Sequence, residues 1–205
     1  MIIKTIPAGV YDVNCYVVVD EATKEAVIMD PGGDADLISR MIKSIGAKPK
    51  MILLTHGHFD HVGGVIDLKN MYNIPSYINE GDQTMMDNKT QVFDVAVPAD
   101  KFVKDGDILK FGSKEIKCIA TPGHSPGGMC YLIGEHLFTG DTLFNSSVGR
   151  SDLPGGNFNE LIGNIKNKLL PLGDNISVYP GHGPSSTIKY EKLRNPFLSG
   201  DMYVY

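Results

Sequence analysis

THGHFDHVGG, at residues 55–64, is the stretch of sequence that decides the fold. It places three imidazoles and one carboxylate within six residues, and both are ligand types that zinc and iron accept. A short apolar run at residues 50–54 precedes it, which predicts a buried strand that opens into this loop. The sequence therefore predicts a divalent-metal cluster where a strand ends.

The spacing of the four side chains sorts them into two directions. Side chains two residues apart in extended backbone point the same way, so His56, His58 and Asp60 could converge on one side. The turn into the following helix directs His61 elsewhere. One metal ion could not easily bind all four side chains. Asp60 is also placed to cap the helix that we expect over residues 62–72.

Hydrophobic periodicity predicts short strands and helices along the whole chain. The expected strands cover residues 1–6, 15–19, 26–29, 51–54, 75–78, 102–103, 108–111, 115–120, 129–133, 136–139 and 176–179, with a turn at residues 7–9. The expected helices cover residues 37–45, 62–72, 80–88, 158–170 and 188–193. This order predicts an α/β fold, a four-layer αββα sandwich in which two sheets pack face to face with helices outside. Residues 1–205 would form a single domain.

Composition and charge disfavour several classes of protein. The chain has 205 residues and a net charge of −5, and its lysines and arginines are scattered, which disfavours nucleic acid as a partner. There is no apolar run of membrane-spanning length and no signal-type leader, so we expect a cytoplasmic protein without membrane contact. Cys15, Cys118 and Cys130 lack paired spacing and are expected to be reduced and buried.

Three further ligand candidates lie at the ends of later strands. Each of His124, Asp141 and His182 comes one to four residues after an expected strand, with glycine directly before it. Loops at one end of the strands of a layered α/β fold gather into a cleft, so these loops can meet around a shared site. Five of the six histidines lie in such loops, whereas His136 lies inside an expected strand.

These motifs resemble those of the metallo-β-lactamase superfamily. THGHFDHVGG, TPGHSPGG around His124, FTGDT around Asp141 and YPGHG around His182 occur in the same chain order as in that family. The resemblance implies two divalent metal ions, most often zinc, with iron or manganese as alternatives. It implies the following ligands: His56, His58 and His124 for the first metal, Asp60, His61 and His182 for the second, and Asp141 as the bridge.

Within the superfamily, the chain is similar to the glyoxalase II, or hydroxyacylglutathione hydrolase, group. Antibiotic-hydrolysing members of the main group typically have a cysteine ligand at the position of Asp141. Asn14-Cys15-Tyr16 and the stretch GRSDLPGG at residues 149–156 carry the same resemblance. Glyoxalase II has a C-terminal helical domain that helps to hold glutathione, and this chain ends 23 residues after His182. Recognition of glutathione itself is therefore an open question on the sequence.

The activity that the resemblance implies is hydrolysis of a small-molecule thioester. Metal-bound water has a pKa of about 7, so a hydroxide that bridges two metals could attack the thioester carbonyl. Asp60 would orient the hydroxide and take its proton in addition to binding metal. Arg150 could contact a substrate carboxylate or form a structural ion pair.

Two other functions stay open on the sequence. Persulfide dioxygenases of the same fold hold one iron with two histidines and an aspartate, here His56, His124 and Asp141, and GRSDLPGG resembles their segment. Alternatively, the fold could be a metal-bound binding module without turnover. The sequence indicates neither the oligomeric state nor a role for Tyr203 and Tyr205.

Overall fold

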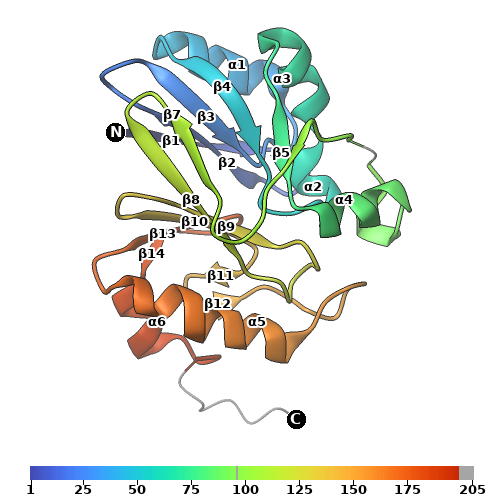
Figure 1. The fold of residues 1–205 in the computed structure, drawn as a ribbon, viewed down its shortest axis with the longest axis vertical. Helices are drawn as coiled ribbons and strands as arrows, with labels where there is room; N and C mark the ends of the chain where they lie inside the picture. Colours follow the sequence, from blue (N-terminus) through green and yellow to red (C-terminus); the bar gives the residue numbers. More distant parts are fainter. Residues whose placement is uncertain (96, 199–205) are drawn as a thin grey trace.

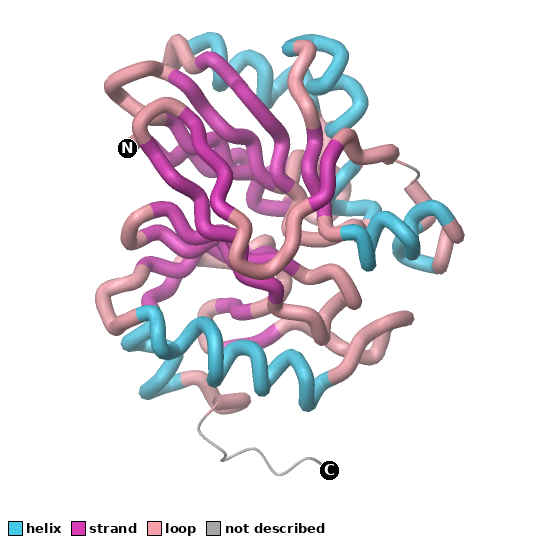
Figure 2. Tube along the Cα trace, viewed as in Figure 1, coloured by secondary structure: helices cyan, strands magenta, loops and turns pink. Residues whose placement is uncertain are grey.

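The computed structural model describes residues 1–95 and 97–198, which form two six-stranded sheets packed face to face. Helices α1 (Ala35–Ser44) and α3 (Val65–Tyr72) cover the outer face of the first sheet (Figure 1). Helices α5 (Phe158–Asn164) and α6 (Ile188–Arg194) cover the outer face of the second (Figure 1). Figure 2 shows the same arrangement as two groups of strands between two groups of helices. The predicted αββα sandwich is confirmed. Tyr203 and Tyr205 lie outside the described residues.

The first sheet has the strand order β1-β2-β3-β4-β5-β6. Its strands are β1 (Ile2–Ala8), β2 (Val13–Val19), β3 (Glu25–Met29), β4 (Lys48–Leu53), β5 (Ser76–Ile78) and β6 (Lys101–Phe102). The pairs from β1 to β3 are antiparallel and those from β3 to β6 are parallel. The helices of this half are α1 (Ala35–Ser44), α2 (Phe59–Val62), α3 (Val65–Tyr72), α4 (Glu80–Asp87) and a short 3₁₀ turn (Gln91–Phe93).

The second sheet has the strand order β14-β13-β10-β9-β8-β7. Its strands are β7 (Ile108–Phe111), β8 (Lys114–Ala120), β9 (Met129–Ile133), β10 (His136–Gly140), β13 (Ser177–Pro180) and β14 (Ser186–Thr187). A separate small hairpin pairs β11 (Leu143–Phe144) with β12 (Ser147–Val148). The remaining helices are α5 (Phe158–Asn164), which continues as a π turn (Ile165–Leu169) and a 3₁₀ turn (Leu170–Leu172), and α6 (Ile188–Arg194).

Three hydrophobic layers hold the four layers of secondary structure together. Successive side chains of a strand point to opposite faces, so a strand between two layers is apolar on both faces. In β2, Val17 packs with residues of α1 and α3, whereas Val18 packs between the two sheets. On the outer face of the second sheet, Leu137 of β10 packs with Leu161 of α5. This pattern explains the continuous apolar runs of the sequence.

The expected state of the cysteines is also found. All three are buried and free. Burial raises the pKa of the Cys130 thiol to about 11, which leaves it neutral and unreactive at pH 7. Among residues 1–95 and 97–198, the structure has no helix that combines the length and apolar character needed to cross a membrane.

Two local predictions are wrong. Pro7 and Ala8 do not lie in a turn but continue β1, and proline is tolerated there because β1 is an edge strand. Asp60 does not cap a helix: α2 begins at Phe59, with His58 in the N-cap position. The hydrophobic pattern after residue 60 suggested a later start, but the carboxylate of Asp60 belongs to the site described below.

The helix that we expect over residues 62–72 is interrupted at Gly63 and Gly64. Glycine has a low helix propensity, and here two glycines follow one another. A Cβ atom on Gly63 would lie 2.5 Å from the carbonyl oxygen of Gly32, so the loop before α1 packs directly against this break. The interruption brings the backbone of α2 close to that loop.

The layer between the sheets should dominate the free energy of unfolding. Phe111 is 2% exposed in this layer, whereas Phe102 is 53% exposed. We expect Phe111→Ala to lower the free energy of unfolding by about 3–5 kcal/mol, and the matched change Phe102→Ala to lower it by about 1 kcal/mol or less. Urea unfolding of the two metal-loaded variants measures both values. Equal losses would contradict the assignment of Phe111 to the main core.

Candidate metal centre

All seven ligand candidates lie together where β4, β8, β10 and β13 end. Four follow β4, and His124, Asp141 and His182 follow the other three strands. One ligand atom from each member of a group lies within 4.8 Å of the others in three groups: His56, His58 and His124; His56, His61 and Asp141; and Asp60, His61 and His182. We call the first of these the first ligand set and the last the second ligand set.

The first ligand set consists of three buried imidazoles. The Nε2 atom of His124 lies 3.1 Å from Nδ1 of His58 and 3.3 Å from Nε2 of His56. Burial lowers the pKa of His56 and His124 and lowers that of His58 to about 3. All three rings are therefore neutral at pH 7, which is the form that binds a metal ion.

The second ligand set combines one carboxylate with two imidazoles. Oδ2 of Asp60 lies 3.3 Å from Nε2 of His182 and 3.9 Å from Nε2 of His61. Burial alone would raise the pKa of Asp60, but the contacts with His182 and His61 lower it. Asp60 is therefore a charged carboxylate at neutral pH.

Asp141 lies between the two ligand sets. Its Oδ1 atom is 3.4 Å from Nε2 of His61, and its Oδ2 atom is 3.7 Å from Nε2 of both His124 and His182. Burial alone would raise the pKa of Asp141, but the neighbouring imidazoles, His61 above all, hold it well below its usual range. A charged carboxylate that faces both sets has the position of a bridging ligand.

The residues present fit a pair of divalent cations. Nε2 of His61 and Oδ1 of Asp141 are buried, and neither has a hydrogen-bond partner among the described residues. Leaving such atoms unpaired costs about 1–3 kcal/mol each, a cost that coordination to a cation would remove. Burial lowers the pKa of His61, but Asp141 and Asp30 outweigh this effect and raise it. The carboxylates thus favour positive charge at this point.

Outer contacts fix the orientation of several rings. Oδ2 of Asp30 accepts a hydrogen bond from Oγ1 of Thr55 at 2.6 Å and contacts Nδ1 of His61 at 3.1 Å. Oγ1 of Thr55 in turn lies 3.0 Å from Nδ1 of His56. Nδ1 of His124 donates to the backbone oxygen of Arg150 at 2.7 Å. Because Nδ1 of His56, His61 and His124 contacts a group outside the cluster, each of these rings presents its Nε2 atom to the centre.

Gly181 shows why glycine precedes a ligand. A Cβ atom at this position would lie 2.3 Å from Oδ1 of Asp141 and 2.8 Å from Cε1 of His61. Any side chain here would therefore displace the carboxylate of Asp141 or the ring of His61. Glycine has no Cβ atom and therefore allows this close approach.

The sequence reasoning missed two acidic residues near the centre. Asp30 follows β3 directly, as the ligands follow their own strands, so the same rule would have found it. Asp82 lies on α4 and is fully buried. It accepts hydrogen bonds from the backbone nitrogens of Gly57 and Gly127. No local pattern marks Asp82, because both partners are distant in the sequence.

An open cavity of about 430 Å³ leads to the cluster. Apart from ligand candidates, it is lined by Tyr11, Phe59, Val92, Arg150 and Leu153. The guanidinium of Arg150 forms two hydrogen bonds of 2.7 Å with the carboxylate of Asp152, and both side chains are largely exposed. Arg150 therefore forms the expected ion pair and also borders the cavity, while its contact with a substrate carboxylate stays a prediction.

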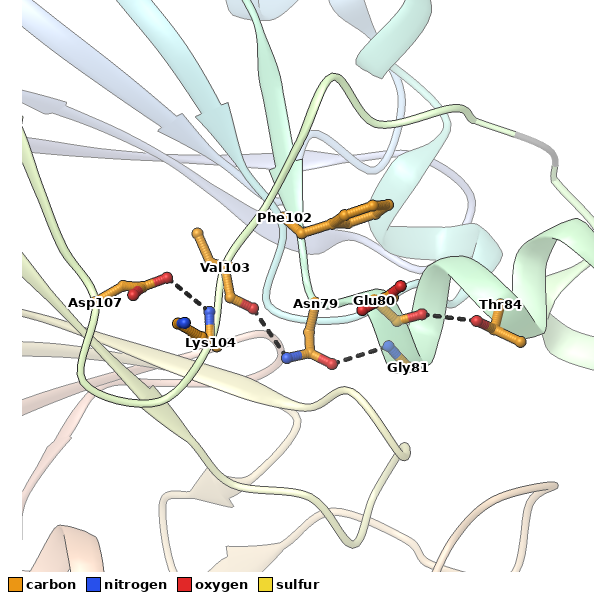
Figure 3. Close-up of a pocket in the computed structure, with 8 residues that line it drawn as sticks. All are labelled: Asn79, Glu80, Gly81, Thr84, Phe102, Val103, Lys104 and Asp107. Atoms are coloured by element: carbon orange, nitrogen blue, oxygen red, sulfur yellow. Dashed lines mark hydrogen bonds between the residues drawn. The ribbon is translucent and has the colours of Figure 1, made fainter.

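A second cavity, of about 560 Å³, lies at the start of α4 (Figure 3). Nδ2 of Asn79 donates to the backbone oxygen of Val103, and Oδ1 of Asn79 accepts from the backbone nitrogen of Gly81. These polar groups already pair with one another, and no ligand candidate lines this cavity. Among the described residues, the candidate metal ligands therefore lie at the first cavity and not at this one.

Known proteins resemble this chain along nearly its whole length. Residues 8–182 match the family described as the metallo-beta-lactamase superfamily. The "Hydroxyacylglutathione hydrolase GloC" of Haemophilus influenzae is 38% identical over 210 residues, which cover 97% of this chain and 99% of that protein. Similarity in sequence is thus not confined to the metal-binding motifs.

Three solved structures have the same architecture. The BLEG-1 B3 metallo-beta-lactamase has a TM-score of 0.90 and 38% identity, and the match covers 97% of this chain and 100% of that one. ETHE1 from Myxococcus xanthus has a TM-score of 0.85 and 28% identity, with 98% and 85% covered. TTHA1623 in a di-iron-bound form has a TM-score of 0.82 and 34% identity, with 95% and 100% covered.

The family match spans most of the chain, and a relative more than 30% identical aligns with nearly all of it. Both comparisons agree with two sheets whose strand ends carry the THGHFDHVGG loop and the three later ligand candidates. The chain belongs to the metallo-beta-lactamase superfamily of metal-dependent hydrolases.

Proposed function

We propose that this protein hydrolyses thioesters of the hydroxyacylglutathione type at two divalent metal ions. The observation that carries the proposal is the position of Asp141, whose carboxylate faces both ligand sets at distances of 3.4–3.7 Å. The similarity to GloC supports the substrate class. An aspartate at this position also agrees with the resemblance to glyoxalase II.

The side chains around the centre have distinct roles in this proposal. Two bound divalent ions would lower the pKa of a coordinated water to about 7 and stabilise negative charge on a carbonyl oxygen. Asp60, charged and next to His182, would orient the water and accept its proton. The leaving group is a thiolate, which is stable near neutral pH, so the site needs no strong general acid.

The lining of the cavity would recognise the substrate. Arg150 offers a planar guanidinium that can bind a carboxylate of the thiol portion with two hydrogen bonds. Its ion pair with Asp152 is exposed, so the contact contributes little stability and a substrate carboxylate can compete for it. Tyr11 and Phe59, with ring centres 5.7 Å apart, supply an apolar surface beside the metals.

Zinc is the metal that we propose, with iron and manganese as alternatives. Histidine and carboxylate ligands accept all three, so the ligand atoms do not select one of them. The similarity to TTHA1623 in a di-iron-bound form supports iron as the first alternative. The metal found would then reflect what the cell supplies as well as the site.

The likeness to ETHE1 from Myxococcus xanthus supports a second candidate, a persulfide dioxygenase with one iron. His56, His124 and Asp141 would hold that iron, since Nε2 of His124 lies 3.3 Å from Nε2 of His56 and 3.7 Å from Oδ2 of Asp141. Oxygen consumption with glutathione persulfide, together with one iron per chain, would favour this candidate over the hydrolase.

Removal and restoration of the metal tests the hydrolase directly. We expect apoprotein to leave S-D-lactoylglutathione intact and zinc to restore turnover, because the proposed nucleophile needs a coordinated water. Loss of the thioester absorbance measures the rate. A β-lactam and glutathione persulfide serve as competing substrates. Protein with two bound metals that turns over either of them but no thioester would contradict the proposal.

Replacement of Asp141 tests the bridging role. We expect Asp141→Ala to lower kcat/KM by at least about 100-fold and to lower the metal content, because both ligand sets lose a shared carboxylate. Asp67→Ala, on the exposed surface of α3, is the matched control and should change neither value. Elemental analysis and kinetics report the two quantities. Full metal content and turnover in Asp141→Ala would refute the bridge.

Replacement of Arg150 tests substrate recognition. We expect Arg150→Ala to raise KM for S-D-lactoylglutathione about tenfold, which corresponds to about 1.4 kcal/mol, with little change in kcat. A thioester whose thiol portion has no carboxylate is the matched control substrate, and its KM should not change. If both substrates respond equally, Arg150 acts through the fold of its loop and not through a carboxylate.

A further inference from the structure

We propose that Asn14 and Asp82 are positioning residues that secure the two metal sites separately, Asn14 for the second ligand set and Asp82 for the first. The inference rests on the metal pair proposed above but not on the identity of the substrate. It concerns residues that would contact neither metal nor substrate. Their side chains hydrogen-bond to the backbone of the loops that carry the ligands.

Each ligand set draws on both halves of the fold. The first set joins two residues after β4 to His124 after β8, and the second joins two residues of α2 to His182 after β13. Hydrophobic packing between the sheets is non-directional, so it cannot by itself fix loops with the accuracy of about 0.5 Å that a metal site needs. Directional contacts between the halves must supply this accuracy.

Asn14 of β2 supplies such contacts to the loop of His182. Its Nδ2 atom donates to the backbone oxygens of Pro180 at 3.1 Å and Gly183 at 2.9 Å, which lie on either side of His182. Its backbone nitrogen also donates to the oxygen of Gly181 at 2.8 Å. One residue of the first sheet thus binds three backbone oxygens of this loop.

His182 needs this support more than the other imidazoles do. Of its side chain, 31% is exposed, compared with 5% for His124 and none for His61. Surrounding side chains therefore hold His182 less firmly. The hydroxyl of Tyr16, two residues after Asn14 on β2, adds a bond of 2.7 Å to the oxygen of Pro180. Hydrogen bonds to the backbone therefore replace packing on this side of the centre.

Asp82 of α4 performs the equivalent task for the first ligand set. Its Oδ2 atom accepts from the backbone nitrogen of Gly57 at 2.8 Å, and its Oδ1 atom accepts from that of Gly127 at 2.6 Å. Gly57 lies between His56 and His58, and Gly127 lies three residues after His124. A single carboxylate thus connects the two loops that supply the three imidazoles.

The environment of Asp82 indicates that this connection is costly to maintain. The residue is fully buried, and burial raises the pKa of its carboxyl to about 6. Burying a carboxylate is costly unless hydrogen bonds replace its lost hydration, so the backbone donors of Gly57 and Gly127 are needed to keep Asp82 in place. The fit is also tight, since a Cβ atom on Gly127 would lie 2.6 Å from the backbone nitrogen of Asp82.

Two isosteric changes test the proposal. Asn14→Asp keeps the shape but directs acceptor oxygens at the backbone oxygens of Pro180 and Gly183. Asp82→Asn leaves one oxygen for two backbone donors. We expect each variant to lose affinity for one metal about 10–100-fold while the other metal stays bound. Asn14→Asp should behave like His182→Ala, and Asp82→Asn like His58→Ala.

The measurement is the number of cobalt ions bound per chain against a competing chelator, with the absorption spectrum of the remaining cobalt. Two imidazoles plus a carboxylate give a different spectrum from three imidazoles, so the spectrum identifies which site is filled. Asn70→Asp and Asp67→Asn, both on the exposed face of α3, are the matched controls for charge. Both controls should bind two ions.

The outcomes separate this inference from the proposed function. Wild-type protein that binds only one ion refutes the metal pair, and the present proposal with it. Two ions in the wild type but equal losses from both sites in a variant, or no loss, refute the positioning roles alone. If either variant fails to fold, two milder changes take its place. Tyr16→Phe removes the neighbouring hydrogen bond to the oxygen of Pro180, and Asp82→Glu shifts the buried carboxylate. Each should weaken the same site as the variant that it replaces.

Discussion

The constraint on which the rest of the structure depends is the close approach of two carboxylates and five imidazoles at the metal centre. Asp60, Asp141 and five imidazoles form three groups whose ligand atoms lie within 4.8 Å of one another. Three buried atoms among them, Nε2 of His58, Nε2 of His61 and Oδ1 of Asp141, have no hydrogen-bond partner in the described part of the chain. Such a cluster opposes folding unless cations occupy it. The glycines beside the ligands and the hydrogen bonds behind them are explained by this one requirement.

Different forces build the scaffold and the site. Three hydrophobic layers set the sheets and helices in place, and apolar side chains of similar volume could be exchanged there at modest cost. The centre depends instead on directional bonds of single atoms, such as Asp30 to Thr55 and the Arg150 oxygen to His124. The fold should therefore tolerate more sequence change than the centre, and TM-scores of 0.82–0.90 at 28–38% identity agree with this tolerance of the fold.

Sequence alone predicted what local patterns encode. Alternation and periodicity predicted the longer strands and the main helices but missed the two-residue strands β11, β12 and β14. The rule that ligands follow strands located all seven candidates. Contacts between distant segments escaped it: Asn14 and Gly183 are 169 residues apart, and Asp82 and Gly127 are 45 apart. The start of α2 was also misplaced, because the apolar pattern of the following helix is visible in the sequence and the packing of Gly63 on Gly32 is not.

In the two proposed functions, the choice between one metal and two depends on the second ligand set. His56 and His124, which would bind metal in either proposed enzyme, are buried and held by further hydrogen bonds, so a metal beside them would be retained in both. The second ligand set depends on the half-exposed His182, which hydrogen bonds to its backbone hold from the opposite sheet. Small changes around Asn14 would then turn a site for two metals into a site for one without a change of fold. On this view, the reaction depends on the hydrogen bonds that position the ligand loops as much as on the ligands themselves.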